Sequence, residues 1–212
     1  MENVVISGAY PERDGTVAPA RAGQQCPFLG GCEGTAKRYS GTRQDESMRA
    51  ALKLLRPTRD DFRLGDYAQC FNWDEIGREY ERQLGAHAGL PDRASEDGWY
   101  AVAFRSKRNP ECRHRDLFDA DRDAYTEAFE TTNGALLVYW FTGLDADNNC
   151  LATCVWTGRD IARSINGLPK HKEAARLADG AYIHHHIDRY SIAWDSAQRR
   201  LDVVPWGGVS TR

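Results

Sequence analysis

The sequence predicts an α+β domain built on an antiparallel sheet and preceded by a helical extension. From Trp99 onward, apolar and aromatic runs of strand length alternate with two helical stretches, in the order strand, helix, strand, strand, helix, strand. Before Trp99, the apolar residues instead recur at helical spacing. We therefore expect a flexible arm over residues 1–44, a helical extension over 45–98 and an α+β domain over 99–206.

The bulk composition is that of a folded protein without an electrostatic preference for nucleic acid or membranes. Of the 212 residues, 41% are hydrophobic and 10% aromatic, which is ample for a packed core, and the net charge is only -3. The first residues include the acidic Glu2 and lack the apolar core of a signal peptide. A cytoplasmic location is the resulting expectation, with the six cysteines as free thiols.

Two helices are predicted in the extension, after a Gly- and Pro-rich arm that has no sustained period. The first covers 45–55 and ends before Pro57. Its apolar side chains recur at i, i+3, i+4 and i+7: Met48, Ala51, Leu52 and Leu55. The second begins at Asn72, where Glu75 completes a capping-box-like start, and it stops near Gly85.

The elements of the α+β domain follow from their own patterns. Strands are expected over 99–105, 135–141, 150–156, 188–194 and 200–204, because these runs are rich in β-branched and aromatic residues. Helices are expected over 116–131, over 157–165 with Thr157 as the cap, and from Pro169 to about His185. A turn at Asn133-Gly134 and a hairpin loop over 143–149 join the middle elements.

This order is the ferredoxin-like βαββαβ arrangement. Two right-handed crossovers place both helices on one face of the antiparallel sheet. The other face must also be covered, because a wet apolar sheet face is unfavourable. Two solutions remain open: a second subunit, which would give a dimeric α/β barrel, or the chain's own N-terminal helices.

Three segments resemble a family of uncharacterised, mainly fungal small proteins. They are Tyr100–Ser106, Leu151–Trp156, and the stretch from His171 through Tyr182 to Ser191. The family is similar in layout to the antibiotic-biosynthesis-monooxygenase-like, dimeric α/β-barrel group. The resemblance covers about residues 71–206 and implies a homodimer and a specialised-metabolite substrate. The group includes cofactor-free oxygenases, cyclases, isomerases, haem enzymes and plain binding proteins, so its fold does not fix a reaction.

Histidines on the last predicted helix are candidates for acid/base chemistry. His171, Tyr182 and His185 share one face of that helix, so both histidines could point into a cavity mouth with Tyr182 as a hydrogen-bond donor between them. The structural alternative places His171 at the rim of a small-residue face. For the triplet His184–His186, the alternative is an exposed C-terminal end of the helix, where the helix dipole stabilises a protonated imidazole.

Strand residues supply the second set of candidates. Strand parity predicts that Arg105 and Arg189 lie on one face of the sheet, among small residues. There they could bind a ligand oxygen, or they could instead pair with Asp188 or Asp195 on the surface. Tyr139 is a further candidate donor. Three tryptophans could line an apolar cavity, although aromatic residues in strands are more often core: Trp99, Trp140 and Trp156.

The cysteines do not indicate a metal site. Cys26 and Cys32 lack a second Cys or His pair at zinc spacing, and Cys150 and Cys154 are too far apart along one strand for a disulfide.

Taken together, the residues predict a small, metal- and cofactor-independent enzyme that moves a proton on a hydrophobic small molecule, by isomerisation, cyclisation or elimination. His171 or His185 would be the base, Tyr139 or Tyr182 a donor, and Arg105 an oxyanion stabiliser, with Trp99, Trp140, Trp156 and Arg189 binding substrate. One alternative is a haem protein with a helix histidine as axial ligand. The other is a non-catalytic ligand-binding or interaction module. Neither nucleic acid nor a membrane is an expected partner.

Overall fold

The computed structural model describes residues 6–7, 41–94, 98–112 and 114–207. Within them the N-terminal elements are β1 (Ile6–Ser7), α1 (Arg43–Leu52), α2 (Tyr67–Cys70) and α3 (Trp73–Ala86). The α+β domain contains β2 (Trp99–Arg108), α4 (His114–Thr131), β3 (Leu136–Phe141), β4 (Asn149–Trp156), α5 (Arg159–Ser164), α6 (Pro169–Ala181), β5 (Tyr182–Asp195) and β6 (Arg200–Pro205). The helix predicted from Asp45 is therefore present, and most of the predicted arm lies outside the described residues.

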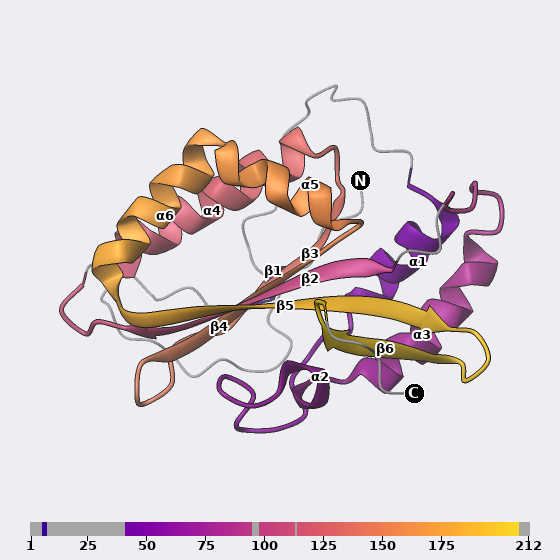
Figure 1. The fold of residues 1–212 in the computed structure, drawn as a ribbon, viewed down its shortest axis with the longest axis horizontal. Helices are drawn as coiled ribbons and strands as arrows, with labels where there is room; N and C mark the ends of the chain where they lie inside the picture. The colour runs from indigo at the N-terminus through magenta and orange to yellow at the C-terminus, as the bar shows by residue number, and fades with distance from the viewer. Residues whose placement is uncertain (1–5, 8–40, 95–97, 113, 208–212) are drawn as a thin grey trace.

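The sheet has the ferredoxin-like order that the sequence predicts. Its strands run β1-β3-β4-β2-β5-β6, and the four central strands pair antiparallel in the sequence order second, third, first, fourth. The short β1 adds to β3 in parallel, and β6 returns from β5 as a hairpin (Figure 1). The α+β, ferredoxin-like fold class is confirmed.

Each face of the sheet is covered by helices of this same chain. On one face α4 and α6 lie side by side, with α5 at their end (Figure 1). Their core includes Tyr100, Ala128 and Trp156. On the other face the extension packs its helices against the sheet, in a core that includes Met48 and Ile192. Of the two covers left open by the sequence, the structure shows the N-terminal helices.

A buried polar contact fixes the extension to the sheet. Asp45 of α1 is 2% exposed, and its Oδ1 accepts hydrogen bonds from Arg93 Nη1 and from the indole Nε1 of Trp99, each at 2.9 Å. The same arginine donates from Nη2 to the backbone oxygen of Thr157 at 2.9 Å. A charge in this position is stable only because it is paired and hydrogen-bonded. Trp99 thus serves the junction between the extension and the sheet.

The boundary between α6 and β5 differs from the prediction. The helix ends at Ala181 rather than near His185, and β5 begins at once with Tyr182, six residues before the predicted start. His184, His185 and His186 therefore lie in an exposed strand and not at a helix end. β2 is also longer than predicted, and its Lys107 pairs with His184. Pairing with β2 makes residues 182–186 a strand, although the spacing of apolar residues over 171–185 also fits a helix.

Two predicted helix caps also differ. α5 has Gly158 as its cap residue, while the hydroxyl of Thr157 is buried and makes no hydrogen bond to the described residues. At the start of α3, Asn72 makes no side-chain cap bond; its Nδ2 donates to Leu54 O at 2.9 Å and to Glu75 Oε2 at 3.0 Å. The helix starts where the sequence indicates, but this asparagine ties it to the end of α1. Across the described part of the chain, none of the helices is long and apolar enough to cross a membrane.

Candidate active site

The candidate site lies between the sheet and the α4/α6 layer, at a carboxyl–phenol pair. Tyr139 of β3 donates a hydrogen bond from its hydroxyl to Asp121 Oδ2 of α4 at 2.5 Å. Burial raises the pKa of Asp121, and this hydrogen bond together with the charge of Arg108 opposes the rise. A carboxylate whose charge is disfavoured in this way is a stronger base than an ordinary aspartate. This pair joins the predicted donor Tyr139 to a carboxyl whose pKa is raised.

Arg108 supplies the positive charge of this region. It is the last residue of β2, only 5% exposed, and its backbone N–H donates to Asn148 O at 2.9 Å. The guanidinium carbon lies 4.9 Å from the Phe118 ring centroid and 5.1 Å from that of Tyr182. Its Nε and Nη1 are buried and have no hydrogen-bond partner among the described residues. A buried donor without a partner costs about 1–3 kcal/mol.

Tyr182 connects this region to the exposed start of β5. Burial raises its pKa to about 12, against the opposing effect of the Arg108 charge. Its ring centroid lies 5.9 Å from that of His185, which also stacks on Phe104 at 5.6 Å. Because His185 is exposed, it lies at the rim of the cluster. Three of the sequence-predicted residues, Tyr139, Tyr182 and His185, are thus gathered around Arg108 and Asp121.

His171 belongs to a different part of the helical layer. It is partly buried on α6, and burial lowers its pKa while the nearby charge of Glu127 on α4 opposes this. It shares no element with His185, so the predicted pairing of the two histidines along one helix face was wrong. The roles of His171 as a base or a haem ligand stay predictions from the sequence.

The two predicted arginines lie on opposite faces of the sheet. Arg189 pairs with Val102 and therefore shares its face of the sheet. Arg105 lies three residues after Val102 on β2, and because side chains alternate along a strand it lies on the opposite face. Arg105 Nε donates to Asp188 Oδ2 at 3.0 Å, and its terminal nitrogens donate to the backbone oxygens of Phe62, Arg63 and Gly65. The expectation that both arginines share one small-residue face was therefore wrong. Arg105 holds the segment between α1 and α2, and Arg189 is exposed.

The three predicted tryptophans are core residues on two different faces. Trp99 and Trp140 are 3% and 5% exposed and belong to the core under the extension. Trp156 is 1% exposed on the α4/α6 side, and its Nε1 donates to Cys154 Sγ at 3.0 Å. Burial raises the pKa of this thiol to about 11, which suppresses thiolate chemistry. Cys70 and Cys150 are free thiols as well, whereas Cys26 and Cys32 lie outside the described residues.

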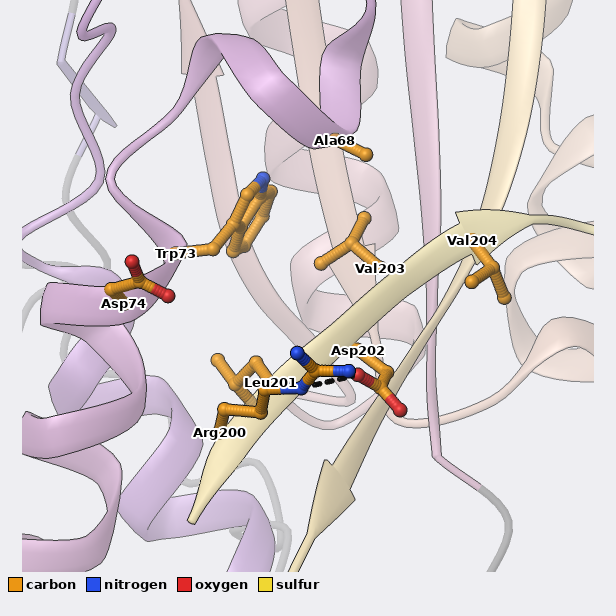
Figure 2. A pocket seen from close by; sticks show the side chains of 8 residues that line it. All are labelled: Ala68, Trp73, Asp74, Arg200, Leu201, Asp202, Val203 and Val204. Carbon is orange, nitrogen blue, oxygen red and sulfur yellow. Dashed lines mark ion pairs between the residues drawn. The ribbon is translucent and has the colours of Figure 1, made fainter. Parts of the chain in front are cut away.

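A shallow hollow of about 300 Å³ lies away from this cluster, between the start of α3 and β6 (Figure 2). Trp73 and Val203 form part of its wall, and Arg200 Nε pairs with Asp202 Oδ1 at 3.1 Å. Both charges are thus already compensated, and no residue predicted for catalysis lines the hollow. We place the candidate chemistry at Asp121 and Arg108 for that reason.

Sequence reasoning missed both Asp121 and Arg108, although each left a signal. Asp121 stands at helical spacing between Leu117 and Ala124, so a carboxylate interrupts an apolar stripe. Arg108 continues the parity of Tyr100, Val102 and Phe104, but the predicted strand ended three residues too early. Among the described residues, no group of three or more His, Cys, Asp or Glu side chains is placed to hold a metal ion.

Comparison with known proteins identifies relatives of the chain. A family model described as PB2B2.08-like matches residues 35–204. UPF0643 protein PB2B2.08 of Schizosaccharomyces pombe is 35% identical over 138 residues, which are 59% of this chain and 58% of that protein. The chain thus matches less than two thirds of the length of its yeast relative.

Solved structures share part of the fold. A Caulobacter crescentus protein whose structure is described as an antibiotic biosynthesis monooxygenase is 14% identical to this chain, with a TM-score of 0.39. The match covers 44% of this chain and 89% of the Caulobacter chain. SnoaB, a cofactor-independent oxygenase from Streptomyces nogalater, is 14% identical, with a TM-score of 0.35, over 42% of this chain and 90% of its own. The family match is the informative result, since it covers most of the chain. The expected fungal family is confirmed: the chain belongs to the PB2B2.08-like family.

Proposed function

We propose that this protein is a small enzyme that removes and returns a proton on a hydrophobic small molecule, with Asp121 as the base. The observation that carries the proposal is the hydrogen bond from Tyr139 to Asp121, in a layer where burial raises the pKa of the carboxyl. General acid–base catalysis is most efficient when the pKa of the base lies near the working pH. Burial moves Asp121 in that direction.

The proposed step is an enolisation. Asp121 takes a proton from a carbon beside a carbonyl group; the C–H electron pair forms the new C=C bond, and the carbonyl π pair moves to oxygen. The protonated Asp121 then returns the proton to the same or another carbon, so no oxidant or reductant is needed. Tyr139 acts as a positioning residue, because its hydroxyl holds the carboxylate oxygen at 2.5 Å. This step is common to isomerisation and cyclisation.

The surroundings of Asp121 favour an apolar substrate. Tyr125 of α4 stacks on Tyr139 with a centroid distance of 5.6 Å, and Phe141 lies 5.8 Å beyond that ring. Burial also raises the pKa of Tyr125, which keeps its phenol neutral. An aromatic environment of this kind suits a hydrophobic carbonyl compound. A specialised metabolite fits this description and stays a prediction.

Carbon–deuterium exchange in D₂O tests the proposal. The full chain is incubated with phenylacetone or phenylpyruvate, and loss of the signal of the hydrogens beside the carbonyl is followed by proton NMR. We expect exchange above background, lost by about 10²–10⁴-fold in Asp121→Asn. Asp123→Asn is the matched control, because Asp123 lies on the same helix and pairs with Arg122 and Lys170.

Wild-type exchange no faster than the buffer, or an Asp121→Asn rate equal to wild type, would contradict the proposal. Tyr139→Phe separates positioning from a structural role. The Tyr139 hydrogen bond lowers the pKa of Asp121, so its removal raises that pKa. The limb of the pH–rate profile that reports the base should therefore move to higher pH in Tyr139→Phe. An unchanged limb would remove Tyr139 from the mechanism.

A further inference from the structure

We infer that Arg108 is a binding site for a monoanionic group, such as a carboxylate or an enolate oxygen, on an apolar ligand held between the sheet and the α4/α6 layer. The inference deepens the proposed function, on which it rests for the identity of the ligand as substrate. Its physical basis is the guanidinium itself, which is 95% buried and has unpartnered N–H donors at Nε and Nη1 within the described part of the chain.

The aromatic neighbours of Arg108 do not satisfy these donors. The guanidinium carbon lies 4.9 Å from the Phe118 ring centroid and 5.1 Å from that of Tyr182, which are cation–π contacts. An aromatic face is at most a weak hydrogen-bond acceptor, so Nε and Nη1 still have no strong acceptor among the described residues. An acceptor that approaches in the plane would complete the hydrogen bonding, and a carboxylate matches that geometry.

The local charge favours a single negative charge on the ligand. Nε and Nη1 of Arg108 have no hydrogen-bond partner among the described residues, although Asp121 is close enough for the arginine to lower its pKa. The Oδ2 atom of Asp121 accepts from Tyr139 instead. A monoanion would neutralise Arg108, whereas a phosphate dianion would place excess negative charge beside Asp121.

Arg108 lies at one end of the sheet, where three elements meet. Its neighbour Asn109 donates from the backbone N–H to Ala181 O at 2.9 Å, so Arg108 lies where β2, the hairpin residue Asn148 and the end of α6 meet. The exposed His185 ring lies beside Tyr182 at this end. In the proposed complex the ligand enters at this end, with its anionic group on Arg108 and its carbon framework toward Asp121.

Calorimetric titration of the full chain tests the inference without any need for turnover. The probes are phenylacetate, cinnamate and octanoate, each compared with the neutral amide of the same shape. We expect saturable binding of at least one carboxylate and binding about tenfold weaker or worse for its amide. In ¹⁵N NMR, the Nε signal of Arg108 should move on carboxylate addition and not on amide addition.

Two variants of Arg108 and one control make the result specific. Arg108→Met removes the charge and should abolish carboxylate binding, and Arg108→Lys keeps the charge but loses the planar donors and should bind weakly. Arg176→Gln is the control, because Arg176 is an exposed arginine of α6 paired with Glu173. Circular dichroism confirms that each variant is folded. Equal binding by Arg108→Met, equal binding of the amide, or no saturable binding of any carboxylate would overturn the inference.

Binding and proton exchange fail independently. Carboxylate binding that depends on Arg108, without exchange that depends on Asp121, would leave the anion site standing and remove the proposed reaction. If phenylacetone exchange depended on Asp121 but no carboxylate bound, the proposed reaction would stand and the anion site would be removed.

Discussion

At the residue scale, the chemistry is carried by side chains whose surroundings come from distant parts of the chain. Tyr139 was predicted as a donor from its strand, but the sequence could not show that it bonds to Asp121, which lies 18 residues earlier on α4. Arg105 illustrates the opposite case. It was the predicted oxyanion stabiliser, yet backbone oxygens of the segment between α1 and α2 accept from its guanidinium. A residue type predicts chemistry only together with its partners, and partners are a property of the fold.

The pH dependence of stability should reveal the raised pKa of Asp121. Its folded-state pKa is raised, so between the unfolded value of 3.8 and the folded value the native state binds more protons. The free energy of unfolding therefore falls as pH rises through that window. Asp121→Asn removes this contribution, so its stability relative to wild type should increase with pH across the window and then level off. Urea unfolding at a series of pH values measures it.

Asp123→Asn provides the reference for that measurement, since its carboxylate is 45% exposed on the same helix. If the stability curves of wild type and Asp121→Asn stayed parallel over the whole pH range, the surroundings of Asp121 would not disfavour its charged form.

At the element scale, the sequence predicts the order of strands and helices better than their ends. The patterns of 116–131 and 150–156 are strong enough that α4 and β4 appear within two residues of the prediction. The α6–β5 boundary is different, because Tyr182 and His185 continue a helical period by spacing alone. Hydrogen bonding with β2 decides in favour of the strand, and a local pattern contains no information about that pairing.

A buried carboxylate of α1 contributes to the docking of this helix, which gives a prediction about the element as a whole. Asp45→Ala leaves Arg93 and the indole N–H of Trp99 without their shared acceptor. Breaking a buried pair by removing one partner costs about 3–5 kcal/mol, so a loss of that order in unfolding free energy is expected. Thermal and urea unfolding with two probes would measure it.

Asp92→Ala is the matched comparison, because Asp92 binds Arg43 at 2.8 Å but is 60% exposed. Exposed pairs contribute about 0–1 kcal/mol, so this variant should unfold almost as wild type does. Equal effects of the two substitutions would mean that the Asp45 contact does not anchor the helix.

At the scale of the whole molecule, the extension takes the place that the sequence left open for a second subunit. The core beneath it joins helix residues such as Leu52 and Tyr80 to sheet residues such as Ala101 and Ile192, all of them 2% exposed or less. The sequence predicted that this face must be covered but could not choose the cover, because helices of the same chain and a partner's sheet both supply apolar surface. A homodimer stays a prediction, and it would have to form through a surface other than this one.

Removal of the extension therefore tests the architecture directly. A chain limited to residues 99–206 would expose the sheet face that now contacts α1 and α3, including Trp99, Trp140 and Tyr190. An uncovered apolar face of that kind drives association, so we expect this shortened chain to form dimers or larger assemblies and to bind the dye ANS. Light scattering beside the full chain measures the difference. A shortened chain that stayed monomeric, with native-like near-UV circular dichroism and no dye binding, would show that the α+β domain does not need the extension. Association is the expected result, because in a monomeric shortened chain the tryptophans and Tyr190 of this face would be exposed to water.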